Sequence, residues 1–247
     1  MTEPKYGGID SRGGKGAHLF RVTSSGNTAK KIDEKARMER ENYVIDAEAV
    51  KNFKKAGEIA IEAMRYAKSL CKPETPLLEV ADLVEERILK KAQLAFPLDL
   101  SINEIAAHYS PLVNDKSIAE GILKIDMGVS VNGYPVDLAR TLDLTDDNRY
   151  AKLVSASKEA LHNVRKILKY GIELRKIGKT VQETISSFGF SSIRNLSGHE
   201  VARYKIHAGL TVPNYDNNNE TKLPEGFFAI EPFATTGEGI VQNGKPS

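Results

Sequence analysis

The chain of 247 residues is 40% hydrophobic and 28% charged, which is typical of a globular protein and excludes collagen-like and low-complexity classes. Its formal net charge is +2, and no apolar run approaches the roughly 20 residues that a membrane-spanning helix requires. The first twenty residues are polar and glycine-rich, unlike a secretory signal. A single cysteine, Cys71, excludes an internal disulfide framework and indicates a reducing, cytoplasmic compartment.

Residues 1–43 form a separate basic extension. Residues 1–40 hold nine Lys and Arg against five Asp and Glu, whereas the rest of the chain is slightly acidic. Glycine and serine clusters leave only a short apolar patch at 17–22, which cannot bury enough surface to offset its ordering entropy. We therefore expect residues 1–43 to be flexible, with a ribosome- or RNA-contacting arm as the alternative. Residues 44–247 are expected to form the folded domain.

Two helices and a strand are predicted next. Asp46 is a suitable N-cap, and apolar residues recur at helical spacing over 50–70. A Lys-Pro pair at 72–73 ends this helix, because the residue before proline disfavours the α conformation. A second helix opens at residues 74–76 and has its own apolar face. A short strand follows over residues 96–102.

Residues 122–144 carry the clearest local motif, a β-hairpin. Two alternating runs rich in β-branched residues flank the pair Asn132-Gly133. Such a pair favours a type I′ turn, because both central residues need a positive φ. A two-residue turn there pairs Val131 with Tyr134 and so determines the register of the whole hairpin.

In that register, two aspartates lie on the same face of the hairpin. Asp137 pairs with Gly128, two residues from Asp126, which makes the aspartates diagonal neighbours about 7–8 Å apart at the backbone. Two facing carboxylates repel each other unless a cation lies between them. The hairpin is therefore a candidate half of a metal site. A surface hairpin with two solvated acids is the alternative.

The second half of the chain repeats the pattern of the first. Helices are predicted over 146–170, where Gly171 ends the helix, and over 174–188; strand-like segments follow at 195–207 and 227–233. The order of two helices, strands, two helices and strands indicates an internal duplication. It favours an α+β fold with helices packed on one face of a curved antiparallel sheet. The second half looks unfinished, because its last strands are missing.

Three histidines and one glutamate stand out besides the hairpin. His108, His199 and His207 lie in loops or irregular segments among small residues. Glu231 lies among phenylalanine and isoleucine residues that predict burial, and a buried carboxylate needs a cation or a shifted pKa. His162, in the middle of a predicted helix, is interpreted as structural.

Several motifs of this sequence match one enzyme family in the same order along the chain. From about residue 50 to its end, the chain resembles the type II methionine aminopeptidases of the archaeal kind. The resemblance does not cover residues 1–43. It rests on the segments 96–111, 124–128, 195–199, 204–209 and 228–235.

The resemblance implies the pita-bread fold, a pseudo-symmetric α+β domain, and a site for two divalent metal ions such as Co, Mn, Fe or Zn. The positions that match the family's metal ligands are Asp126, Asp137, His199 and Glu231. In that family a metal-bridging hydroxide attacks the peptide bond after an N-terminal methionine. A Lewis acid supports this chemistry, because it lowers the pKa of bound water and polarises the carbonyl group.

The same resemblance implies roles for three further residues. His207 matches the histidine that contacts the scissile amide of the substrate. His108 matches a histidine near the leaving peptide, with a role in proton transfer or positioning. Phe96 matches a wall of the pocket for the methionine side chain.

Two departures from the family pattern modify this expectation. The family's last glutamate, which bridges both metals, and the helical insertion of type II enzymes have no counterpart in this sequence, as in a C-terminally truncated member. One ion then keeps Asp137, His199 and Glu231, whereas a second keeps only Asp126 and the shared Asp137 and is bound more weakly. We therefore expect little turnover of peptides that begin with Met-Gly.

The resemblance implies a cytoplasmic, monomeric enzyme that acts on nascent peptides with an N-terminal methionine and does not bind membranes. One alternative is a non-catalytic pita-bread protein that binds ribosomes or RNA through its basic arm. The four retained ligands argue against that alternative. Another is a related metal-dependent Xaa-Pro dipeptidase, but the sequences around His108, His199 and His207 look closer to the methionine enzyme.

Overall fold

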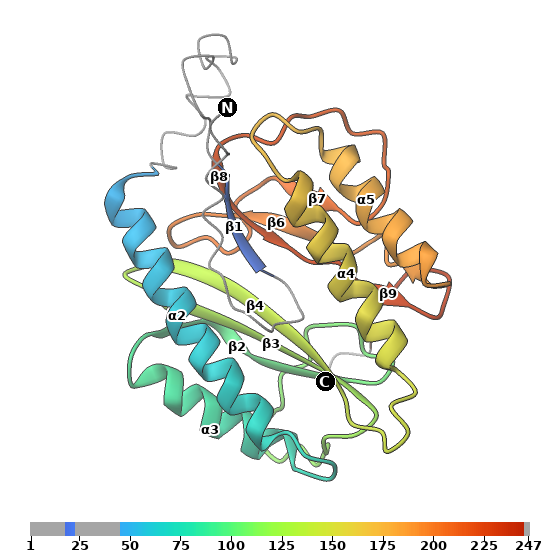
Figure 1. Cartoon of the computed structure of the whole chain (residues 1–247). Helices are drawn as coiled ribbons and strands as arrows, with labels where there is room; N and C mark the ends of the chain where they lie inside the picture. Colours follow the sequence, from blue (N-terminus) through green and yellow to red (C-terminus); the bar gives the residue numbers. More distant parts are fainter. Residues whose placement is uncertain (1–17, 23–44, 245–247) are drawn as a thin grey trace.

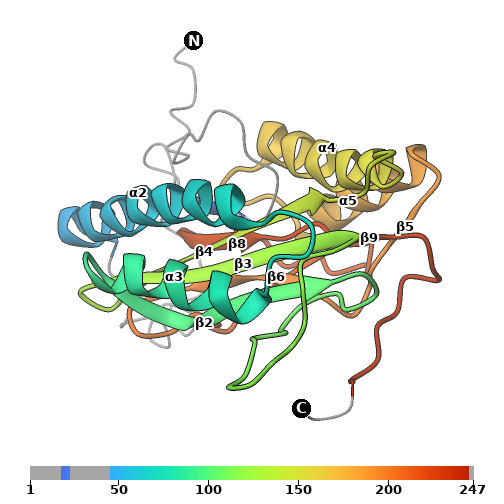
Figure 2. The same ribbon diagram turned by 90° about the horizontal axis from the view of Figure 1, so that it is seen from below.

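A computed structural model describes residues 18–22 and 45–244 of the chain. The first half of the domain is a three-stranded antiparallel sheet covered by two helices (Figures 1 and 2). Its strands are in the order β2-β3-β4, and its elements are α2 (Ala47–Leu70), α3 (Leu77–Leu89), β2 (Gln93–Ile102), β3 (Ile122–Val131) and β4 (Tyr134–Asp143).

The second half is a four-stranded antiparallel sheet in the order β1-β8-β6-β7, packed against two more helices. Figure 2 shows that α2 and α4 lie along the same side of the strands. None of the helices in the described ranges has the length and apolar character needed to cross a membrane. The elements of this half are β1 (His18–Val22), α4 (Ala151–Ile167), α5 (Leu174–Ser187), β6 (Ser197–Val201), β7 (Thr211–Pro213) and β8 (Gly226–Ile230), with β5 (Ser191–Ser192) and β9 (Ala234–Thr235) in a separate pair.

The predicted N-cap and the predicted hairpin are both confirmed. The Asp46 carboxylate accepts a hydrogen bond from the backbone N–H of Ala49 at 2.7 Å, so the first turn of α2 is capped. Strands β3 and β4 pair so that Val131 lies opposite Tyr134. Both turn residues have a positive φ, 53° at Asn132 and 81° at Gly133.

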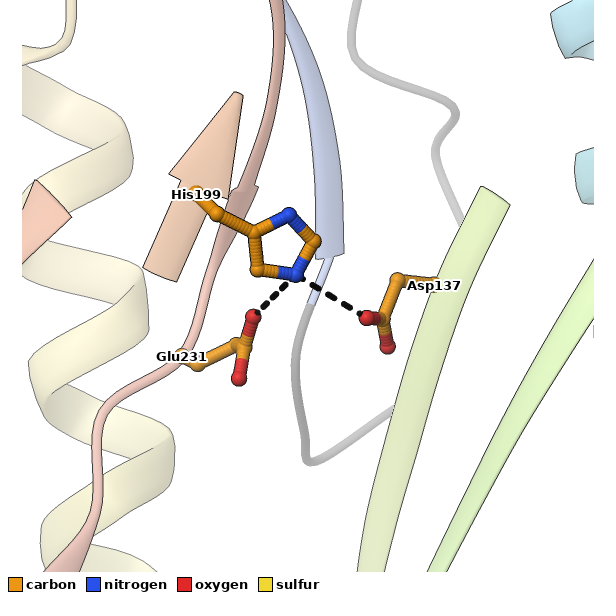
Figure 3. Close-up of side chains that lie close together, drawn as sticks. All are labelled: Asp137, His199 and Glu231. Atoms are coloured by element: carbon orange, nitrogen blue, oxygen red, sulfur yellow. Dashed lines mark hydrogen bonds and ion pairs between the residues drawn. The ribbon is translucent and has the colours of Figure 1, made fainter. Parts of the chain in front are cut away.

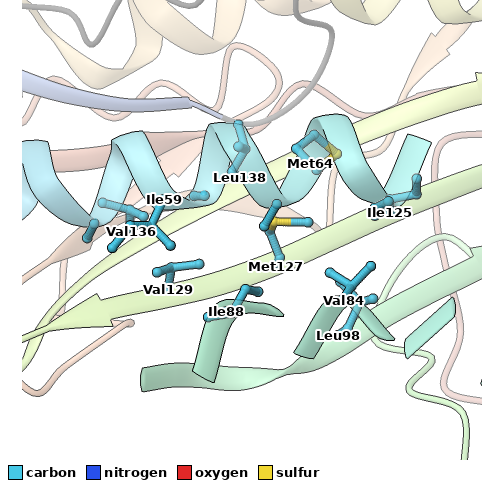
Figure 4. Close-up of a cluster of buried hydrophobic side chains, with 14 of the residues drawn as sticks. Ile59, Met64, Val84, Ile88, Leu98, Ile125, Met127, Val129, Val136 and Leu138 are labelled. Carbon is cyan, nitrogen blue, oxygen red and sulfur yellow. The ribbon is translucent and has the colours of Figure 1, made fainter. Parts of the chain in front are cut away.

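Alternation along the hairpin separates the core from the site. One face of β3 and β4 carries apolar side chains that pack under α2 and α3 in the larger of two cores (Figure 4). The opposite face carries Asp126 and Asp137, as the predicted register requires. The labelled core residues are Ile59, Met64, Val84, Ile88, Leu98, Ile125, Met127, Val129, Val136 and Leu138.

The predicted helix over 146–170 is shorter at both ends, since α4 covers only Ala151–Ile167. At its start, the Asp143 carboxylate accepts hydrogen bonds from the backbone N–H groups of Thr145 (3.0 Å) and Tyr150 (2.8 Å). These bonds hold the residues just before Ala151, the first residue of the helix, in a turn. At its end, the backbone becomes extended at Leu168, with ψ 118°, so the helix stops before Gly171 rather than at it. Gly171 has φ 77° and donates its N–H to the carbonyl of Leu223 at 2.8 Å.

The expectation of a flexible basic extension is wrong for its apolar patch. Residues 18–22 form β1, which pairs with β8 along its whole length and also lies beside β4 (Figure 1). Phe20 and Val22 are buried in the second core, against residues of α4, α5 and β8. The patch is ordered because it pairs with the edge of β8 and buries Phe20 and Val22 in the second core. The rest of residues 1–43 lies outside the described ranges.

Phe20→Ala is expected to lower the free energy of unfolding by about 3 kcal/mol, because it removes a buried ring and leaves a cavity in the second core. Arg21→Ala is the matched control, since this side chain is exposed on the same strand and should change little. Urea denaturation of the two variants measures the difference. Equal, small losses for both would show that β1 adds little to stability.

Candidate metal centre

Three of the four predicted metal ligands meet where the two sheets adjoin (Figure 3). Asp137 lies in the middle of β4, His199 at the centre of β6, and Glu231 directly after β8. One ligand atom from each lies within 4.8 Å of the others. The two sheets therefore assemble this group from residues that are up to about 90 positions apart in the sequence.

The imidazole of His199 lies between the two carboxylates. Its Nε2 is 3.2 Å from Oδ2 of Asp137 and 2.9 Å from Oε1 of Glu231. His199 and Asp137 are only 5% and 6% exposed, so water does not solvate their charges. We call these three residues the ligand trio.

Buried oxygens at this site lack hydrogen bonds within the described part of the chain. They are Oδ1 of Asp126, Oδ1 of Asp137 and Oε1 of Glu231, the last of which is close to His199 only as an ion-pair contact. Unpaired buried carboxylate oxygens are costly in a protein interior. Carboxylates with one imidazole suit a divalent cation such as Mn²⁺, Fe²⁺ or Co²⁺. The donor set therefore fits a metal ion.

The electrostatics of the site show the same need for positive charge. Burial raises the pKa of Glu231 to about 7, although its close contact with His199 acts in the opposite direction. Burial opposes the charged form of His199, but the contacts with the carboxylates of Asp137 and Glu231 outweigh it and raise the pKa of the imidazole to about 10. Protons that would neutralise excess negative charge are thus retained at neutral pH.

Asp126, the fourth predicted ligand, lies beside the ligand trio rather than within it. Burial raises the pKa of its carboxyl group well above the ordinary value, and the negative charges of Asp137 and Glu231 raise it further. Asp126 is therefore close enough to interact strongly with both carboxylates. A role for Asp126 in holding a second ion stays a prediction.

The two other histidines singled out from the sequence, His207 and His108, are both exposed. The ring of His207 meets that of His199 edge to face, with 4.3 Å between ring centroids. Burial and the neighbouring His199 lower the pKa of His207, which favours its neutral form. His108 is exposed and interacts electrostatically with His207. Since the imidazole of His207 is exposed and contacts His199, it can reach a molecule that approaches the trio from solvent.

Phe96 lies in the same sheet as Asp137, and its ring packs against Gly128. Gly128 is the strand partner of both Phe96 and Asp137, so the three residues form one row across the sheet. A Cβ at Gly128 would lie 2.4 Å from Cδ1 of Phe96, so only glycine lets the ring cover the sheet at this point. The side chain of Phe96 is half-buried and can take up an apolar group.

Asp99 was not anticipated from the sequence. It lies on β2, its strand partner is Asp126, and it is 7% exposed. It interacts electrostatically with Asp137 and His108. An aspartate between two leucines in a predicted strand is a detectable signal, because alternation directs it away from the apolar face.

Comparison with protein families gives one match over most of the chain. The model of metallopeptidase family M24 matches residues 51–245, which include the ligand trio, Asp126, His108 and His207.

Individual relatives agree with this match. The chain is 48% identical to a methionine aminopeptidase of Thermococcus onnurineus over 194 residues, which are 76% of this chain and 64% of that protein. It is 42% identical to a methionine aminopeptidase of Methanocaldococcus jannaschii, over 81% of this chain and 69% of the relative. The chain thus spans about two thirds of the length of these relatives. A crystal structure of methionine aminopeptidase from Thermotoga maritima superimposes with a TM-score of 0.73 at 28% identity, covering 82% of this chain and 86% of that one.

Proposed function

Because the chain belongs to metallopeptidase family M24, we propose that it is a metal-dependent aminopeptidase that removes an N-terminal methionine from peptides. A relative that is 48% identical to this chain is named methionine aminopeptidase. This favours removal of methionine over the activity of an Xaa-Pro dipeptidase. The observation that carries the proposal is the buried ligand trio, whose unpaired oxygens fit a divalent cation.

Asp137, His199 and Glu231 are the residues that would hold the ion, and Asp126 with Asp137 would hold a second, weaker one. When bound, such a cation polarises the carbonyl of the scissile peptide bond and lowers the pKa of water. The carboxylate of Asp137 stays aligned because its strand is held on one side by β3 and lies beside β1 on the other.

The protein's own side chains would orient the substrate. A neutral His207 can donate one hydrogen bond and accept another, which suits contact with the scissile amide. His108 would assist at the leaving peptide, by positioning it or by transferring a proton. Phe96 would contact the methionine side chain as a wall of its pocket, and the place of its ring against Gly128, the strand partner of Asp137, supports this role.

The cellular setting belongs to the same proposal. The substrates would be nascent chains in the cytoplasm, where the free, buried thiol of Cys71 stays reduced. The protein would act as a monomer, and its basic N-terminal residues would contact the ribosome. A non-catalytic ribosome- or RNA-binding role is less well supported, because binding alone does not explain a buried trio with unpaired oxygens.

Methionine release from a Met-Gly peptide tests the activity. We expect slow release that depends on added Mn²⁺ or Co²⁺ and stops with EDTA. His207→Ala should lower kcat by roughly 100-fold, because a positioned imidazole next to the reacting amide is lost. His162→Ala, on the exposed side of α4, is the matched control. Hydrolysis of Ala-Pro without release from Met-Gly would favour the dipeptidase, and no metal-dependent release from either would overturn the proposal.

A further inference from the structure

We propose that Asp99 is a positioning residue for His108: by accepting a hydrogen bond from Ser110, it holds the loop that carries His108 against strand β2. The role in catalysis rests on the proposed function, whereas the positioning itself does not. Asp99 lies on the same sheet as the two aspartates of the hairpin, opposite Asp126, but outside the ligand trio. Binding of a metal ion by the trio therefore does not explain why the carboxylate of Asp99 is buried.

The hydroxyl of Ser110 donates a hydrogen bond to Oδ1 of Asp99 at 2.5 Å. The next two residues of β2 hold the neighbouring backbone. The N–H of Leu100 donates to the carbonyl of Tyr109 at 2.7 Å, and the N–H of Tyr109 donates to Oγ of Ser101 at 3.3 Å. Residues 99–101 therefore hold the two residues that directly follow His108.

The backbone of His108 explains why such anchoring is needed. Its φ is 64°, in the left-handed region that costs free energy for any residue with a Cβ. That conformation persists only if the residues on either side are held in place. The hydrogen bond from Ser110 to Asp99 fixes the residue two positions after His108.

The position of Asp99 also links the loop to the metal centre. Asp99 interacts electrostatically with His108 on one side and with Asp137 of the ligand trio on the other. The strand that carries Asp99 is paired with β3, which carries Asp126. The spacing between His108 and the trio therefore depends on β2 through the Asp99–Ser110 contact.

Hydrogen exchange of the full chain tests the positioning without any need for catalysis. The matched pair is Asp99→Asn and Asp99→Leu, which have similar size and no charge, although only asparagine keeps an oxygen acceptor. We expect Asp99→Leu and Ser110→Ala to speed exchange of the Tyr109 amide about tenfold, because the loop opens more often. Asp99→Asn should stay within about twofold of the wild type.

The controls separate local from global effects. Ser155→Ala removes a similar hydroxyl on the exposed side of α4 and should leave the Tyr109 amide unchanged. Protection of this amide that survives in Asp99→Leu would overturn the proposal. Equal loss of this protection in Asp99→Asn and Asp99→Leu would also overturn it. Faster exchange of the whole chain, rather than of this loop, would do the same.

Turnover of the Met-Gly peptide tests the consequence for His108. Asp99→Leu and Ser110→Ala should lower kcat about tenfold with little change in KM. Asp99→Asn should keep most of the wild-type kcat. Unchanged kcat in Asp99→Leu would contradict the catalytic part of the inference. If the wild type itself shows no turnover, the proposed function fails, and the exchange rates alone decide whether Asp99 positions the loop.

Discussion

Mn²⁺ or Co²⁺ is expected to raise the melting temperature of the metal-free protein, and His199→Ala is expected to abolish the rise. A ligand that binds only the folded state adds about 2.7 kcal/mol of stability at 100 times its Kd. For a chain of this size, that corresponds to a shift of about 5–10 °C. The effect should depend on His199, because its Nε2 lies between Asp137 and Glu231 in the ligand trio.

Thermal unfolding with EDTA and with added metal measures this shift within each variant. The comparison must be made within a variant, because His199→Ala also removes the partner of two buried carboxylates and changes the metal-free stability. His162→Ala is the control, since it removes an exposed imidazole on α4 that is not part of the ligand trio. This variant should keep the full metal-induced rise in melting temperature. A full metal-induced shift in His199→Ala would show that the ion binds elsewhere.

The second large effect concerns pH. Without metal, the contribution of the site to stability is expected to fall as the pH rises from about 4.5 to 7. Glu231 has its pKa raised from 4.5 to about 7, so the folded state binds more protons than the unfolded state across this range. The raised pKa of Asp126 acts in the same direction. His199, with its pKa raised from 6.5 to about 10, stabilises fully below 6.5 and loses this contribution as the pH rises further.

Urea denaturation in EDTA at several pH values measures this dependence. Surface carboxylates with lowered pKa values, such as Glu62 and Asp147, change stability only below their ordinary pKa and so stay outside the window. Glu231→Gln should flatten the fall between pH 4.5 and 7. The metal-induced shift should grow over the same range, because the ligands must lose protons to bind an ion. An unchanged slope in Glu231→Gln would show that Glu231 does not titrate in this window.

The hairpin could be predicted in detail because its information is local. An Asn-Gly turn between alternating strands determines the pairing of every residue, and it correctly placed Asp126 and Asp137 on one face. Strand β1 could not be predicted in this way. Its five residues have no local signal of order, and their partner is the edge of β8, which no nearby residue reveals.

The residues of the candidate site could be predicted from the sequence, including the group of three that lie together. The motifs identified Asp137, His199 and Glu231, which the structure brings together. The distances within this group could not be predicted, because they depend on how the two sheets adjoin. The aspartate between two leucines showed that Asp99 lies on the polar face of its strand, but only the pairing of β2 with β3 reveals that it lies opposite Asp126.

The pairing of β1 with β8 also has a consequence for the order of events during synthesis. The elements α2 to β4 lie within residues 47–143 and can assemble as soon as they leave the ribosome. Strand β1 is made first, yet its partner follows about 200 residues later, a delay of roughly 10–40 s at ordinary elongation rates. Phe20 and Val22 therefore stay without their core during this interval. The first strand to be made is among the last to be placed, and chaperones that bind apolar segments have this time to act on it.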